Sequence, residues 1–259
     1  LTADGSFALG AAVSAALTLS GHPVLALAAA LAAGGLAGLV TGLLQIKAGI
    51  APILSGILTM SGLYTVNLAI QGGAPNLSLL GHTTLFTLFP GLDKAAARSL
   101  LPPLCCGVVL LALTWFFRTR AGLYIRAAGS NESMSRAVSV DVDRAKLTAL
   151  ALSNGCVALS GALLAQYQGY CDVNAGAGTM VIGLAAVVLG EAALRGSGVP
   201  AGLLATAAGS LLYQLLLAAA VRYNVFPAYA FKLVSAALVG LALSLPALRR
   251  RLTLRRERM

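Results

Sequence analysis

Long apolar stretches that carry almost no charge divide this sequence, and they constrain its fold more than any other feature. Only 10% of the 259 residues are charged and 58% are hydrophobic, whereas soluble domains carry about 25% charge. About 17–25 apolar residues suffice for a helix to cross the hydrocarbon core of a bilayer. The sequence therefore predicts an all-α integral membrane protein with about eight membrane segments, at residues 5–19, 23–44, 50–70, 101–117, 147–168, 179–190, 201–221 and 228–245.

Two of these segments, 5–19 and 179–190, are predicted to be too short to cross as regular helices at 1.5 Å per residue. They also resemble each other, since GSFALGAAV at 5–13 is similar to GTMVIGLAAV at 178–187. On the topology proposed below they run in opposite directions, which indicates an inverted repeat with discontinuous helices. Chance similarity in a chain rich in glycine and alanine is the alternative.

Basic residues set the orientation of the chain. The polar interruption at 118–146 and a basic tail at 247–259 together hold most of the Lys and Arg. Placing both in the cytoplasm satisfies the positive-inside rule, so the net charge of +10 is explained without nucleic acid as a partner. Residues 71–99 are then an external loop, with one surface helix expected near 93–99. We predict a single transmembrane domain over residues 1–259.

The sequence offers no catalytic or metal-binding constellation. Its four cysteines and two histidines lack the spacing of a metal site, and no phosphate-binding GxxxxGK[ST] motif is present. Asp141 and Asp143, beside Arg144 and Lys146, are interpreted as a solvated, charge-balanced turn. We therefore expect a chain that is not an enzyme and that binds no cofactor or metal itself.

Polar residues inside the apolar runs are candidates for a substrate path, because lipid makes them costly. Asp4 and Ser6 precede the first short segment, where they either cap a helix or face the path. Met60, Tyr64 and Asn67 are spaced i, i+4 and i+7, so they share one helix face that suits a pocket wall. Hydrogen bonding between helices is the alternative for Asn67. The candidates are Asp4, Ser6, Met60, Tyr64, Asn67 and Asn154.

The polar interruption contains its own helical pattern at residues 131–140. Ser130 or Asn131 can cap a helix with an acidic residue in its first turn. Met134, Ala137 and Val138 then form a small apolar face at helical spacing. Such a face lies on a lipid surface or docks in the groove of a partner. It lacks Trp and Phe, which argues against a dedicated membrane anchor.

Several motifs carry a resemblance to a known family. The stretches TRAGLYIRAAGSNESMSR, ALSGALLA and GLAAVVLGE resemble permease subunits of bacterial ATP-binding-cassette (ABC) importers, in the group that serves branched-chain amino acids and ribose. LTADGSFALGAA and GILTMSGLYTVNLAIQG are similar to permeases of tryptophan/tyrosine-type systems. The likeness covers nearly the whole chain. It implies a passive subunit in the bacterial cytoplasmic (inner) membrane that imports a small solute. The implied solute is an amino acid, and within that class an aromatic amino acid. It also implies an additional N-terminal helix.

The resemblance further implies partners and a coupling helix. Members pair with a second permease, here as a homodimer, with ATPase subunits that bind ATP and Mg²⁺, and with an extracytoplasmic substrate-binding protein. Relatives often have glycine where this chain has Ser139. This departure affects how the chain leaves the end of the coupling helix. The alternative is an ion-coupled secondary transporter, for which Asp4 is the one buried acid available. The implied coupling residues are Gly129, Asn131, Glu132, Met134, Ser135, Arg136, Ala137, Val138 and Val140.

Overall fold

The computed structural model describes residues 2–88, 94–194, 198–222 and 240. This part of the chain is mostly helical, and six of its helices are long and apolar enough to cross a membrane. A further apolar helix is shorter. The all-α membrane fold predicted from the sequence is thereby confirmed, although the run at 228–245, apart from residue 240, lies outside the described residues.

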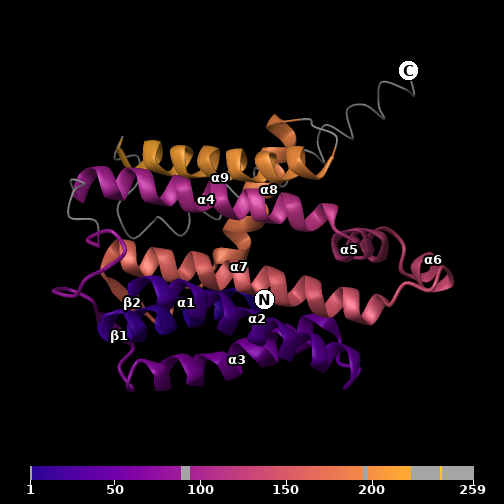
Figure 1. Cartoon of the computed structure of the whole chain (residues 1–259), viewed down its shortest axis with the longest axis horizontal. Helices are drawn as coiled ribbons and strands as arrows, with labels where there is room; N and C mark the ends of the chain where they lie inside the picture. The colour runs from indigo at the N-terminus through magenta and orange to yellow at the C-terminus, as the bar shows by residue number, and fades with distance from the viewer. Residues whose placement is uncertain (1, 89–93, 195–197, 223–239, 241–259) are drawn as a thin grey trace. The chain divides into compact units, whose positions relative to one another are not determined.

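The chain forms two compact units, Leu1–Thr179 and Met180–Met259. The first unit contains, in order, α1 (Thr2–Leu19), α2 (Pro23–Ile46), α3 (Pro52–Ile70), β1 (Asn76–Ser78), α4 (Lys94–Arg118), α5 (Arg120–Ser130), α6 (Glu132–Ala137), α7 (Val142–Gln168) and β2 (Tyr170–Asp172) (Figure 1). The helix α8 (Thr179–Ala193) starts at the last residue of this unit, and α9 (Val199–Arg222) follows in the second unit.

Helix α1 is the centre of the first unit, packed against α2, α3 and α7 (Figure 1). Small residues let the backbones approach closely, which is how helices associate in lipid. A Cβ atom added to Gly10 of α1 would lie 1.9 Å from the carbonyl oxygen of Ala158 in α7. On α2, a Cβ at Gly38 would lie 2.2 Å from the carbonyl oxygen of Leu150. Glycine at these positions sets the spacing of the bundle.

A small two-stranded sheet covers one end of this bundle. Strand β1 pairs antiparallel with β2, with Leu77 opposite Cys171. Cys171 is buried with Leu79 against alanines of α1 and α7. The pairing holds part of the predicted external loop 71–99 onto the helices.

Proline and glycine account for several helix ends. Pro23 and Pro52 are the first residues of α2 and α3, where the missing N–H has no cost. Helix α7 ends at Gly169, which adopts the left-handed conformation with φ 79°, as glycine commonly does after a helix.

Two predictions about the elements are corrected by the structure. The first segment is not too short to cross, because α1 already starts at Thr2 and has 18 residues. The surface helix expected near 93–99 is not separate, since α4 starts at Lys94 and continues through Pro102 and Pro103. By contrast, α8 is short as predicted, with 15 residues.

The second unit is held by the same kind of close packing. A Cβ atom at Gly209 of α9 would lie 2.0 Å from the carbonyl oxygen of Ala186 in α8. Tyr213 is buried beside Ala185, with Ile182 and Leu189 packed around them. Helices α8 and α9 therefore form a tight pair within this unit.

Candidate functional site

The polar interruption folds into two short helices, α5 and α6, between the long helices α4 and α7. Helix α4 runs across Figure 1, whereas α5 is seen nearly along its axis, so the chain turns sharply after Arg118. Thr119 caps α5 by accepting a hydrogen bond from the N–H of Gly122 at 3.5 Å. A Cβ atom at Gly122 would lie 2.5 Å from the Cα atom of Phe117. The turn therefore depends on glycine at position 122.

Asn131, one of the two predicted caps, begins α6. Its Oδ1 accepts hydrogen bonds from the N–H of Met134 at 3.0 Å and from the hydroxyl of Ser133 at 2.8 Å. The helix ends at Ala137, so it is shorter than the predicted 131–140. Ser139 follows with φ 61°, a left-handed conformation that favours glycine. This explains physically why glycine suits the position where the sequence departs from the family pattern.

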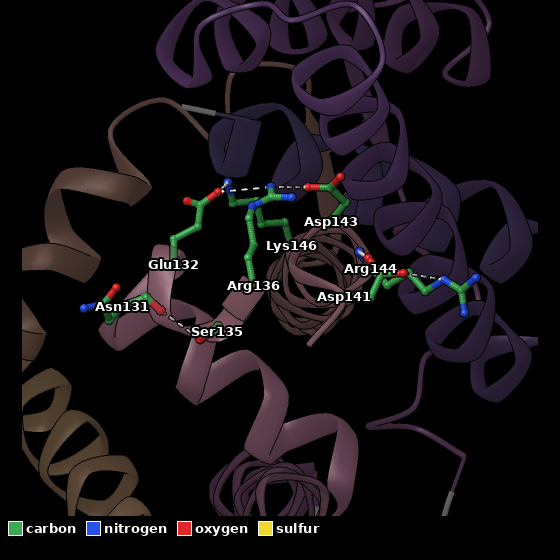
Figure 2. Close-up of polar contacts among 8 residues, drawn as sticks. All are labelled: Asn131, Glu132, Ser135, Arg136, Asp141, Asp143, Arg144 and Lys146. Carbon is green, nitrogen blue, oxygen red and sulfur yellow. Dashed lines mark hydrogen bonds and ion pairs between the residues drawn. The ribbon is translucent and has the colours of Figure 1, made fainter. Parts of the chain in front are cut away.

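Four charged side chains tie α6 to the start of α7 (Figure 2). Arg136 donates to Asp143 at 2.8 Å and to Glu132 at 3.3 Å, and Lys146 donates to Glu132 at 2.7 Å. We call Glu132, Arg136, Asp143 and Lys146 the charge cluster. Hydrogen bonds from Lys146 and Arg136 lower the pKa of Glu132. Hydrogen bonds to Asp143 and Glu132 raise the pKa of Arg136. Both shifts favour the charged forms of Glu132 and Arg136.

The two aspartates between α6 and α7 have specific structural roles. Asp141 caps α7, because its carboxylate accepts a hydrogen bond from the N–H of Arg144 at 3.0 Å. It also forms an ion pair with the Arg144 side chain at 2.9 Å. Asp143 belongs to the charge cluster (Figure 2). Both carboxylates stay partly exposed and are paired with arginines, so the predicted solvated, charge-balanced turn is confirmed, and the structure adds the cap and the contact with α6.

The apolar side chains of α6 have no cover within the described part of the chain. Met134 is 66% exposed and Val138 is 67% exposed, and Ala137 is exposed as well. Ser135 is buried, and its hydroxyl donates to the carbonyl oxygen of Asn131 at 2.8 Å. The helix thus turns a polar side inward and an apolar side outward.

The other predicted coupling residues flank α6, with Gly129 exposed near the end of α5 and Val140 half-buried after Ser139. A cleft of about 410 Å³ lies between the charge cluster and the turn that joins α2 to α3. Its lining residues are Gln45, Ile46, Gly49, Ile50, Ala51, Pro52, Arg136, Asp143 and Lys146.

Most of the predicted path residues bond neighbouring helices. The hydroxyl of Ser6 donates to Oδ1 of Asn154 at 2.8 Å. The side-chain amide of Asn67 donates to the carbonyl oxygen of Gly5 at 3.4 Å, and its own Oδ1 is buried without a partner among the described residues. The structure therefore brings Ser6, Asn67 and Asn154 together around α1.

The predicted shared face of α3 is only partly realised. Met60 lies against Gly5 of α1, on the same side as the buried Asn67. Tyr64 is half-exposed and lies off this packed side. The three residues therefore do not line one pocket in the described structure.

Asp4 has a role that the sequence did not assign to it. It lies inside the first turn of α1 and does not cap this helix. Its carboxylate instead accepts hydrogen bonds from the N–H of Gly178 at 3.1 Å and from the hydroxyl of Thr179 at 2.9 Å. These residues begin α8, so Asp4 caps a helix that is distant in sequence.

Gln166, a polar residue of α7, connects several elements. Its side chain accepts a hydrogen bond from the N–H of Leu85 at 2.9 Å and donates to Ser14 and to the carbonyl oxygen of Pro23, both at 3.0 Å. A buried glutamine in an apolar run signals such a contact, but the sequence does not identify the partners. Within the described residues, no group of three or more His, Cys, Asp and Glu side chains could hold a metal ion.

Comparison with known proteins gives the family. The model of the branched-chain amino acid transport system / permease component family matches residues 1–245. The chain belongs to this permease family. With its long apolar helices, the permease is a multi-pass protein of the bacterial cytoplasmic membrane.

Curated relatives differ in the substrates that their names give. The permease is 36% identical to a tyrosine transport system permease of Clostridioides difficile (strain R20291), over 83% of this chain and 70% of that protein. It is 30% identical to the ribose import permease of Escherichia coli (strain K12), over 76% and 61% of the two chains. It is 27% identical to a galactofuranose transporter permease of the same strain, over 83% and 62%. No solved structure matches the permease.

Proposed function

We propose that this permease forms the membrane path of an ABC importer and that a separate ATPase supplies the energy, with ATP and Mg²⁺ bound to that partner. The observation that carries the proposal is α6, a capped helix that exposes Met134 and Val138. Short amphipathic helices with an uncovered apolar face dock in grooves of partner proteins. We assign α6 and its flanking residues 129–140 to ATPase coupling.

The charge cluster gives α6 a route for transmitting motion. Arg136 binds Asp143 of α7, and Lys146 of α7 binds Glu132 of α6. Because α6 is tied to α7 at two points, displacement of α6 by the ATPase moves the start of α7. Helix α7 packs along α1 and α2, so this displacement biases the bundle between two states of access.

The proposed assembly contains further partners. A second copy of the permease completes a homodimer, and an extracytoplasmic binding protein delivers the solute. We place the path beside the start of α8, where Asp4 bonds Gly178 and Thr179. Discontinuous helices mark substrate sites in transporters, and this supports the placement.

An amino acid, and among amino acids an aromatic one, is the proposed solute. The tyrosine transport relative supports it with 36% identity, against 30% for the ribose permease. Uptake of labelled tyrosine, leucine and ribose by cells that express the complete transport system tests the choice. We expect the cells to take up labelled tyrosine, and we expect unlabelled ribose not to reduce this uptake. Ribose uptake without tyrosine uptake refutes the proposed solute but leaves the importer intact.

The docking of α6 is tested by placing a charge on its apolar side. We expect Met134→Asp to remove the ATPase that copurifies with the permease from native membranes, and to abolish uptake. Leu80→Asp is the matched control, since Leu80 is a highly exposed leucine in the predicted external loop and far in sequence from α6. An ATPase that stays bound to Met134→Asp contradicts the assignment of α6.

Arg136→Glu tests the role of the charge cluster in coupling. The substitution places a carboxylate between Glu132 and Asp143, so it breaks both contacts of Arg136 in the charge cluster. We expect ATP hydrolysis to lose its dependence on solute, or the ATPase to dissociate, while the permease stays folded and elutes as a single species. Normal transport by this variant contradicts the coupling role. Transport that continues in vesicles without ATP favours the ion-coupled alternative.

A further inference from the structure

Helix α5 is amphipathic, and one of its sides has no cover within the described chain. Its 11 residues follow directly on α4, a helix whose apolar window has no buried residue. Gly122 packs against the end of α4, and α5 also contacts α7. On its open side, Leu123 is 51% exposed and Tyr124 is 49% exposed.

The charged side chains of α5 and of the two residues before it are all positive. Arg118, Arg120 and Arg126 are all exposed, and residues 118–130 contain no Asp or Glu. Among the described residues, the ion pairs of this region join Arg136, Arg144 and Lys146 to carboxylates, and none involves these three arginines. Their charge is therefore available to an anionic partner.

The position of α5 at the end of a membrane span limits what that partner can be. In Figure 1, α5 is viewed nearly end-on while α4 and α7 run across the picture. A helix that crosses its neighbouring spans at a steep angle, directly after one of them ends, lies in the plane of the membrane surface. Basic amphipathic helices in this position bind anionic lipid.

We propose that α5 is an interfacial helix that binds anionic phospholipids at the cytoplasmic surface of the membrane. Leu123 and Tyr124 lie at the boundary between headgroups and acyl chains, and Arg118, Arg120 and Arg126 contact lipid phosphates. Guanidinium groups suit this contact because they bind phosphate oxygens in pairs. The inference rests on the membrane orientation and not on the solute or the ATPase.

A tryptophan introduced on α5 tests the proposal. Trp115 is the one tryptophan of the chain, so Trp115→Phe combined with Leu123→Trp gives a single reporter. The variant is reconstituted in vesicles of phosphatidylcholine and phosphatidylglycerol at 7:3, with bromine on the acyl chains of either lipid. At equal bromine content, we expect brominated phosphatidylglycerol to quench the tryptophan fluorescence at least twofold more strongly than brominated phosphatidylcholine does.

The arginines are tested on this reporter background. We expect Arg120→Gln with Arg126→Gln to make the two lipids equal quenchers, because each basic residue strengthens binding to an anionic surface by about fivefold. Arg144→Gln is the matched control, since Asp141 already engages this arginine, and it keeps the difference. All variants are compared as monodisperse protein in detergent before reconstitution.

Two results would overturn the proposal. Equal quenching by both lipids in the parent reporter contradicts the preference for anionic headgroups. A reporter that neither lipid quenches lies outside the membrane. If that same reporter shifts to shorter wavelength in native membranes, a protein partner covers α5 and the lipid assignment is wrong.

Discussion

The close approach of α1 and α7 makes Gly10 a position where one methyl group has a large expected effect. A Cβ atom there would lie 1.9 Å from the carbonyl oxygen of Ala158 and 2.4 Å from its carbonyl carbon. These are backbone atoms, so no side chain can rotate away. The Cβ–oxygen contact reaches an ordinary 3.4 Å only if the helices separate locally by about 1.5 Å.

The cost of Gly10→Ala follows from this separation. Overpacking of a tight interface costs about 1–3 kcal/mol, and the Ser6–Asn154 hydrogen bond one turn away contributes about 1 kcal/mol. The higher helix propensity of alanine stabilises the folded state by up to about 1 kcal/mol and offsets part of this loss. We therefore expect a net destabilisation of about 2 kcal/mol, or roughly 4–8 °C in Tm at 2–4 °C per kcal/mol.

Gly62→Ala is the matched control. Gly62 lies within α3, and a Cβ atom there has no neighbour within 4 Å. The same substitution should therefore leave Tm unchanged or raise it by a few degrees, because only helix propensity changes. Tm is measured in one detergent from the loss of monodisperse protein on heating. If both variants have the same Tm, the glycine contact does not set the helix spacing and the reasoning is wrong.

Three further predictions follow from local geometry. Ser139 has φ 61°, and this left-handed conformation destabilises the folded state by about 1 kcal/mol for an L-residue. Ser139→Gly should therefore slow hydrogen exchange of the α6 amides by about fivefold, and an unchanged exchange rate contradicts this. Burial, with a smaller effect of the Asp172 carboxylate, raises the pKa of Cys171 to about 12, so water-soluble maleimide should not label it between pH 7 and 9 until detergent unfolds the protein. Asp4→Ala should lower the free energy of unfolding by about 1–2 kcal/mol, because a helix cap is lost. Thr179→Val in the same background should lower it little further. If the effects of the two substitutions add fully in a double-mutant cycle, the two residues are not in contact.

The long helices could be predicted because each is specified locally. The apolar runs predicted at 23–44 and 50–70 match α2 and α3 within two residues at each end. Proline at the first helical position sets the start of each. Helix α7 extends five residues before its apolar run because Asp141 caps it. Hydropathy does not register a cap of this kind.

Helix α5 was not predicted because its formation depends on contacts outside the segment. Residues 120–130 contain Gly122 and Gly129, and glycine weakens an isolated helix. Packing of Gly122 against the end of α4 and contacts with α7 support the helix in the folded chain. The charge cluster has the same origin, because Lys146 reaches Glu132 across 14 residues.

Asp4 shows where a correct chemical interpretation can fail in its geometry. The sequence leaves two alternatives for this residue, a helix cap and a carboxylate that faces the substrate path. The structure shows a cap, but on an unexpected helix. Ser6, two residues later, bonds Asn154, which lies near the middle of the 27-residue α7. Asp4 itself is partly buried. A carboxylate among apolar helices is costly unless it is bonded, and the N-terminus of a helix offers both donors and a favourable dipole. The carboxylate thereby supplies an acceptor for the N–H of Gly178, a group for which lipid would provide none.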